Sequence, residues 1–253
     1  MRRHRKPGNL KAKIGFLAFT LTIIVAVLAL STPTGSQVEG QVKKAVILDT
    51  LKPNPAFIER VQACLEEAGY QVDIYQGEEV TVKFLENFPG GYRLVILRLH
   101  SALYRDEGLY FFTGEPYTTT KYVYEQLVGD VKKAYAYEGA KPVFAVSQAF
   151  IGQHLKGKFK NAVIIAMGCD TMTDPLMPTQ FIRQGALAYI GWGGLVTLPH
   201  SDRAVAHLIE NLYAKGLTIE EAVKDTMRQV GPDPQYHAKL NYYPPKAGKQ
   251  RVI

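Results

Sequence analysis

After residue 42, short apolar runs alternate with longer amphipathic stretches. Uninterrupted apolar runs at 45–48, 94–97 and 162–167 are typical of strands buried on both faces of a parallel sheet. After the first run, apolar residues recur at helical spacing, at Phe57, Val61, Leu65 and Ala68. This alternation predicts an α/β fold with a mostly parallel sheet and helices on both faces.

Capping residues and turns predict where the elements begin and end. Asn54 is suited to cap the first helix, Pro55 to begin it and Gly69 to end it. We expect strands at 45–49, 71–75, 94–99, 143–146, 161–168 and 188–192. Helices are expected at 55–68, 81–87, 148–156, 178–185, 201–216 and 218–231, the last beginning with the capping box Thr218–Glu221.

Two segments depart from this rhythm. Residues 102–140 contain seven Tyr and two Phe, and 109–117 resembles a hairpin. We interpret 102–140 either as an excursion from the sheet edge near a site or as a structural, aromatic-stabilised hairpin. Residues 231–253 contain four prolines and are expected to be extended or loosely packed.

The net charge of +7 comes almost entirely from the N-terminus. Six basic residues precede residue 14, no acidic residue occurs before residue 31, and the remainder is nearly neutral. Nucleic-acid binding is therefore not expected. After the basic flank 1–13, the uncharged run 14–30 predicts a membrane anchor or, as the alternative, a cleaved signal segment. Residues 31–42 then form a linker, and the domain at 43–230 lies outside the cytoplasm.

The chain has two cysteines. Cys64 lies on the apolar stripe of the first helix, which predicts a buried core residue and argues against a disulfide. Cys169 directly follows the strand 161–168. It is then a free thiol in an exported domain, which is unusual and favours a reactive role.

His100 ends a second buried strand, 94–99. The carboxyl edge of an open α/β sheet is where ligands bind. A His and a Cys at that edge are a plausible acid/base and nucleophile pair. His200, in the loop after the last strand, is the rival partner for Cys169.

Taken together, these segments resemble the caspase-fold cysteine peptidases, the group of gingipain, clostripain, CHAT-type proteins, separase and caspases. The resemblance covers roughly residues 43–230. It rests on Leu99-His100-Ser101 and on Met167-Gly168-Cys169-Asp170, each after an apolar strand, and on the segment 181–192 that follows. It implies a three-layer sandwich and a cysteine endopeptidase that hydrolyses a protein or peptide substrate.

In the mechanism that the resemblance implies, Cys169 attacks the scissile carbonyl and His100 protonates the leaving amine. Backbone N–H groups near Ser101 and at Gly168-Cys169 would stabilise the oxyanion. Candidates for lining the substrate groove are Asp170, Trp192, Gly193 and Asp202.

Two departures from the family pattern narrow this expectation. Ser101 replaces the glycine that often follows the His. Met167 replaces an Asp that binds a basic side chain in some members, so a preference for Arg or Lys has no support from that position. The alternative function is a catalytically silent binding module on the same fold.

Other chemistries lack their sequence signatures. No closely spaced Cys/His pair predicts zinc, and no glycine-rich dinucleotide motif follows the first strand. The elbow of serine hydrolases is missing as well. We therefore expect neither a metal nor a cofactor. A Cys169 that forms a thiolate is expected to be alkylated faster than an ordinary thiol.

Overall fold

The computed structural model describes residues 42–104 and 107–252. A six-stranded sheet has the order β10-β9-β8-β3-β1-β2, and only β10 runs antiparallel to its neighbour. Its strands are β1 (Lys43–Asp49), β2 (Tyr70–Gln76), β3 (Tyr92–Arg98), β8 (Val163–Ala166), β9 (Ala188–Trp192) and β10 (Leu240–Tyr243). The predicted α/β fold with a mostly parallel sheet is confirmed.

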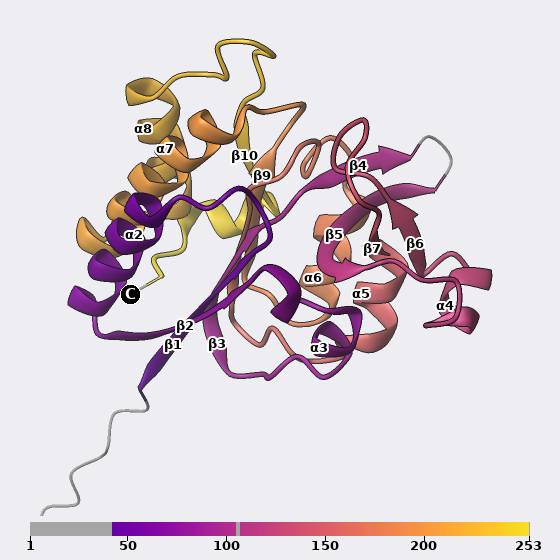
Figure 1. Cartoon of the computed structure of the whole chain (residues 1–253). Coiled ribbons are helices and arrows are strands. Elements are labelled where there is room, and N and C mark those ends of the chain that lie inside the picture. Colours follow the sequence, from indigo (N-terminus) through magenta and orange to yellow (C-terminus); the bar gives the residue numbers. More distant parts are fainter. Residues whose placement is uncertain (1–41, 105–106, 253) are drawn as a thin grey trace, which may run out of the picture. The chain divides into compact units, whose positions relative to one another are not determined.

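Helices cover both faces of this sheet (Figure 1). One face packs against α2 (Pro55–Glu67), α7 (Leu198–Ile209) and α8 (Ile219–Gln229). The other face packs against α3 (Val82–Glu86), α5 (Gln148–His154) and α6 (Leu176–Arg183). The predicted caps at Asn54 and Thr218 are both present, and Ser147 caps α5.

The tyrosine-rich segment builds a second, antiparallel sheet of order β4-β5-β7-β6. Its strands are β4 (Ser101–Tyr104), β5 (Gly108–Pro116), β6 (Val131–Ala134) and β7 (Val143–Ser147). The predicted hairpin at 109–117 is wrong, because β5 crosses it as one strand. Gly114 does not mark a turn there; a Cβ at this residue would collide with the Gly77 backbone in η1 (Gly77–Glu79).

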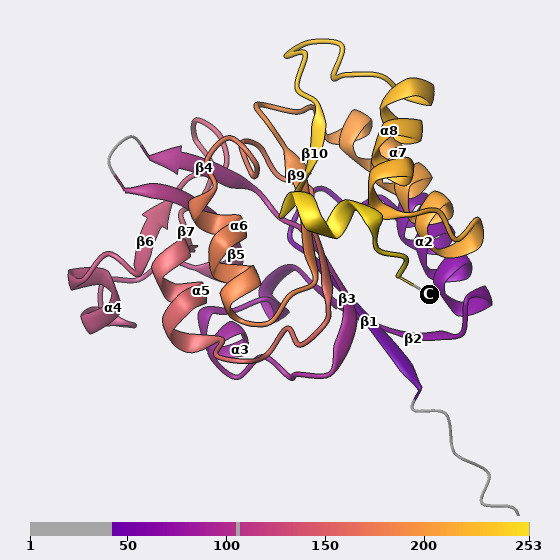
Figure 2. The same ribbon diagram turned by 180° about the vertical axis from the view of Figure 1, so that it is seen from behind.

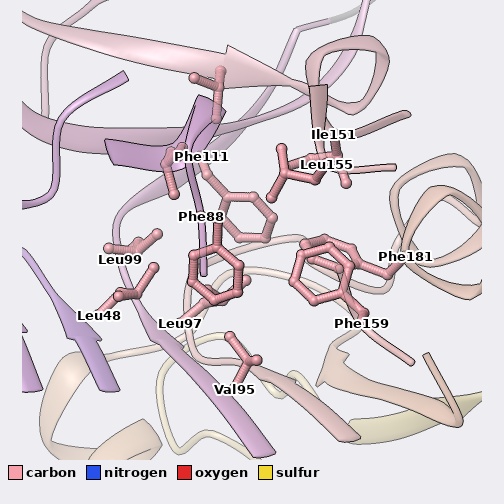
Figure 3. A pocket seen from close by; sticks show the side chains of 12 residues that line it. Leu48, Phe88, Val95, Leu97, Leu99, Phe111, Ile151, Leu155, Phe159 and Phe181 are labelled. Atoms are coloured by element: carbon pink, nitrogen blue, oxygen red, sulfur yellow. The ribbon is translucent and has the colours of Figure 1, made fainter. Parts of the chain in front are cut away.

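A shared apolar core joins the second sheet to the first. β7, which had been expected to belong to the parallel sheet, contributes Phe144 and Val146 to this core. Figure 3 shows the small apolar cavity inside it, where Phe88, Phe159 and Phe181 gather. The ring centroids of Phe159 and Phe181 lie 4.9 Å apart. Burial of these rings holds the two sheets together.

The C-terminal segment is better ordered than predicted. β10 pairs with β9, with Leu240 opposite Trp192, and η3 (Pro245–Lys249) follows it (Figure 2). Leu240 and Ala247 are buried in the core beneath α8. The prolines interrupt helix formation, but they do not prevent this segment from covering the sheet edge.

α4 (Val123–Leu127) projects from the second sheet (Figure 1), and α7 continues into the π-helical η2 (Glu210–Ala214). α7 begins at Leu198, three residues before the predicted start at Ser201. The predicted flank, anchor and linker at 1–42 fall almost wholly outside the described residues; within those, no helix is long and apolar enough to cross a membrane.

A buried ionic network ties the carboxyl ends of β1 and β3 to α7. The Arg98 side chain has no exposed surface. It donates to Asp49 at 2.6 Å and, through two nitrogens, to both Asp202 oxygens at 2.9 Å. The Lys52 carbonyl accepts a further bond, and Asn54 Nδ2 donates to Asp202. Each of the three guanidinium nitrogens of Arg98 therefore has a partner inside the protein.

Replacement of Arg98 should destabilise the fold strongly. Arg98→Ala leaves Asp49 and Asp202 buried without their counterion, so we expect a loss of about 3–5 kcal/mol in the free energy of unfolding. Urea unfolding of the full-length protein measures it. Arg93→Ala, at an exposed position of the same strand, is the control and should change stability by no more than about 0.5 kcal/mol. Equal effects of the two variants would contradict this role of Arg98.

Candidate functional site

His100 and Cys169 lie at the same edge of the parallel sheet. β3 and β8 are neighbours, and Leu97 is opposite Ala166 at the end of their pairing. The Met167 N–H then donates to the Leu97 carbonyl at 2.9 Å. His100 lies three residues after Leu97, and Cys169 lies three residues after Ala166. Strand register therefore brings the two predicted residues to equivalent positions.

Both side chains line one cleft at this edge. The end of β3 contributes Leu99 and His100, and the end of β8 contributes residues 167–169. The opposite wall comes from Leu51 after β1 and from Val196 and Leu198 around the start of α7, with Ala136 from the segment after β6. The ends of two neighbouring strands, the start of α7 and the connections after β1, β6 and β9 thus meet at the cleft.

The thiol of Cys169 is held by the backbone of Val196. Cys169 Sγ lies 3.7 Å from the Val196 carbonyl oxygen, to which it donates, and 3.5 Å from the Val196 nitrogen, whose N–H it accepts. Burial raises the pKa of Cys169, and the N–H of Val196 opposes this only in part. The charges of Asp170 and Asp233 raise the pKa further. This environment favours a resting thiol over a preformed thiolate.

His100 is placed at the joint between the two sheets, between β3 and β4. Its carbonyl accepts the Phe112 N–H at 2.9 Å, and its ring lies against the Phe112 ring at a centroid distance of 6.2 Å. The imidazole remains accessible to solvent. Partial burial lowers the pKa of His100, and the Arg98 guanidinium lowers it further. His100 is therefore neutral near pH 7.

No hydrogen bond joins the His100 imidazole to Cys169 Sγ among the described residues. The resting pair is thus a neutral imidazole and a neutral thiol across one cleft. A neutral imidazole has a free nitrogen lone pair that can accept a proton. The arrangement is chemically suited to a general base beside a nucleophile, with proton transfer upon closer approach.

Ser101 and Gly168 lock the two site strands together. Ser101 Oγ donates to the Cys169 carbonyl at 2.6 Å. A Cβ on Gly168 would collide with Ser101 Oγ and would come within 2.6 Å of the Leu99 carbonyl oxygen. Position 168 therefore has to be glycine, because both Ser101 and the Leu99 carbonyl exclude a side chain there. The Ser101 side chain points to the backbone of Cys169 and fixes the turn that carries the thiol.

The backbone N–H of Cys169 has no acceptor among the described residues. Asp170, the next residue, adopts a positive φ of 59° and donates its own N–H to the Gly194 carbonyl. The Cys169 N–H is therefore a free donor on the residue that carries the thiol, and a free backbone donor of this kind can stabilise an oxyanion.

Asp233 supports the opposite wall of the cleft, and sequence reasoning missed it. Its side chain accepts the N–H and Oγ1–H of Thr197 at 2.8 and 2.7 Å. It also accepts the backbone N–H groups of Gln235 and Tyr236. Burial raises its pKa, but these hydrogen bonds outweigh burial and lower the pKa to about 2. The available signal was the run Gly231-Pro-Asp-Pro234, in which an Asp commonly caps a turn.

The four groove candidates do not lie together. The Trp192 side chain is fully buried, and its indole N–H donates to Ser201 Oγ at 3.0 Å. Asp202 is buried beside Arg98, so its charge is already paired. Gly193 is exposed and its N–H donates to the Lys239 carbonyl, while Asp170 accepts a bond from Thr173 Oγ1. None of these four residues lines the cleft that holds Cys169.

The rival histidine lies elsewhere. His200 is buried, and its Nε2 lies 3.1 Å from the Gly231 carbonyl oxygen, which favours the tautomer with the proton on Nε2. Its other nitrogen lies 3.2 Å from an Arg203 nitrogen. His200 thus connects α7 to the segment after α8, and it does not line the cleft. In the described part of the chain, no group of three or more His, Cys, Asp or Glu residues is placed to hold a metal ion.

Comparison with known proteins adds no family to this picture: no family model matches the sequence, and no curated protein matches it either.

Loss of the Asp233 carboxylate should destabilise the cleft wall in a pH-dependent way. Asp233→Asn is expected to cost about 1–3 kcal/mol at pH 7, because charge-assisted hydrogen bonds are lost. The pKa of about 2 lies below the ordinary 3.8, so the stabilisation is present above pH 3.8 and disappears as pH falls toward 2. Urea unfolding at a series of pH values measures both effects.

Glu59→Gln is the matched control for that series, because Glu59 undergoes the same carboxylate-to-amide change at an exposed position of α2. It should change stability at pH 7 by less than about 0.5 kcal/mol. A loss in Asp233→Asn that persists unchanged at pH 2 would show that the carboxylate charge is not the cause.

Alkylation should report the resting state of Cys169. Because its pKa is raised above 9.0, the iodoacetamide rate should be below that of glutathione at pH 7 and should still increase above pH 9. Mass spectrometry separates Cys169 from Cys64, the other free cysteine. A plateau reached below pH 7 would instead indicate a thiolate paired with imidazolium.

Proposed function

We propose that this chain is an extracytoplasmic cysteine endopeptidase of the caspase-fold group, anchored to the membrane through residues 14–30. Cys169 is the nucleophile and His100 the acid/base in this proposal. The observation that supports it best is that strand register places both residues in one cleft at the carboxyl edge of a parallel sheet. The order of segments, with His after one strand and Gly-Cys after its neighbour, agrees with the resemblance.

The reaction would begin from the neutral pair. His100 accepts the proton of the Cys169 thiol while the sulfur forms a bond to the scissile carbonyl carbon. The carbonyl oxygen becomes an oxyanion next to the free N–H of Cys169. When the C–N bond breaks, the imidazolium gives its proton to the departing amine. The products of this half are a thioester on Cys169 and a free amine.

Water would complete the cycle. His100 takes one proton from a water molecule as the oxygen attacks the thioester carbon. The C–S bond then breaks, the acid is released, and the proton returns to sulfur. The net change is hydrolysis of one peptide bond. Because Arg98 and partial burial keep the pKa of His100 low, the imidazole starts each half in the form that accepts a proton.

A second candidate is a catalytically silent binding module on the same fold. The raised pKa of Cys169 and the missing hydrogen bond to His100 favour it, because both describe an unactivated thiol. The free Cys169 N–H and the neutral His100 favour the peptidase, since an inert buried cysteine requires neither. Only turnover separates the two.

A fluorogenic peptide library tests the peptidase directly. With the full-length protein in mild detergent, Cys169→Ala and His100→Ala should each lower kcat/KM by at least about a thousandfold, as expected for members of one catalytic unit. Cys64→Ala removes the other thiol, on α2, and should retain activity. Circular dichroism and thermal unfolding confirm that each variant is folded.

Full activity of Cys169→Ala would exclude Cys169 as nucleophile. A folded wild type that cleaves no peptide would support the silent module. If Cys64→Ala alone lost activity, Cys64 and not Cys169 would be the nucleophile.

A further inference from the structure

The cleft beside Cys169 is apolar on every side except at the two reactive groups. Met167 and Leu99 are almost completely buried beneath it, and Val196 is 8% exposed. Leu51 and Leu198 are half-buried at its border. Apart from His100 and Cys169, every described residue that lines the cleft has an apolar side chain or none.

The charged residues around the cleft are already engaged. Asp49 and Asp202 are neutralised by the buried Arg98. Asp233 accepts four hydrogen bonds, and Asp170 accepts one from Thr173. Asp170 and Asp233 keep their negative charge, but neither residue lines the cleft. Among the described residues, no carboxylate in the lining can therefore pair with a cationic ligand. No guanidinium lies in that lining either, and each nitrogen of Arg98 donates inside the protein.

The apolar wall is in direct contact with the nucleophile. Val196 holds the Cys169 thiol through both of its backbone polar groups and also lines the cleft. A side chain that fills this cleft therefore lies next to the carbonyl under attack. In a peptide, the side chain nearest that carbonyl belongs to the residue whose own C=O is attacked, the P1 residue.

We propose that this cleft binds an apolar P1 side chain, of the size of Leu, Met or Phe, and that the protein cleaves after such residues. The inference rests on the proposed function of Cys169. Burial of an apolar side chain against Met167, Val196 and Leu198 is favourable, and each methylene group contributes to discrimination. A charged side chain would lose its water without gaining a partner in the cleft.

Peptides that differ only at P1 test this substrate class. With full-length protein, kcat/KM for Leu, Met or Phe at P1 should exceed that for Arg, Lys or Asp by at least about tenfold. Leu198→Asp places a carboxylate at the first residue of α7, where a helix N-terminus tolerates it. This variant should shift the Leu-to-Arg ratio toward Arg by at least about tenfold.

Leu176→Asp is the matched control, because Leu176 is an exposed first residue of α6 outside the cleft. Its P1 profile should equal that of the wild type. A wild-type preference for a charged P1 residue would overturn the proposal, as would equal profiles of Leu198→Asp and Leu176→Asp.

A second measurement needs no turnover and separates this inference from the proposed function. Cys169 is alkylated with N-benzyl iodoacetamide, with iodoacetate and with (2-bromoethyl)trimethylammonium, and each rate is divided by the rate for glutathione. The normalised alkylation rate with N-benzyl iodoacetamide should exceed the normalised rates with both charged reagents by at least about tenfold. In Leu198→Asp, the normalised rate with the cationic reagent should rise relative to the other two. If no peptide is cleaved but this order holds, the peptidase fails while the apolar cleft stands. Equal normalised rates refute the cleft proposal whether or not peptides are cleaved.

Discussion

The buried guanidinium of Arg98 is the group on which the geometry of the site depends. A charge inside a protein is tolerated only when its partners are fixed around it. Here those partners are Asp49 at the end of β1, Asp202 in α7 and the Lys52 carbonyl. The same segments carry Leu51 and Leu198 into the cleft. One ionic network thus sets the distance between the sheet edge and the helix that faces it. Its positive charge also lowers the pKa of His100, two residues away in the sequence.

The elements of the parallel sheet were predictable from sequence because local signals and burial agree there. Apolar runs identified β1, β3 and β8, and caps identified the starts of α2 and α8. The site residues His100 and Cys169 followed from strand ends alone. His100 and Cys169 line one cleft because β3 and β8 are neighbouring strands. The sequence gives the order of strands along the chain, whereas their order in the sheet depends on pairing between distant segments.

Other features depend on contacts between distant residues and left weaker signals. The segment 109–117 resembles a hairpin in sequence, whereas the glycine within it, Gly114, is required by the nearby backbone of Gly77. β10 was missed because prolines dominate the local pattern, while its stability comes from pairing with β9. Arg98 in an apolar run was a visible anomaly, but its partners lie 49 and 104 residues away. Trp192 and Asp202 were candidates for the substrate groove because of the segments in which they occur. Both side chains are instead buried in the core.

Because Gly168 packs directly against Ser101, the two walls of the cleft differ in the side-chain substitutions that they can accept. On one wall, the strands that carry His100 and Cys169 are interlocked so closely that even one methyl group does not fit between them. On the other wall, Leu51 and Val196 belong to connections between elements and Leu198 begins α7. Asp233 holds the connection before α7 through hydrogen bonds to Thr197. New ligand preferences would therefore arise by exchange of side chains on this second wall, whereas the interlocked wall has no room for a larger side chain at position 168. Side chains on the second wall could therefore change while His100 and Cys169 keep their positions.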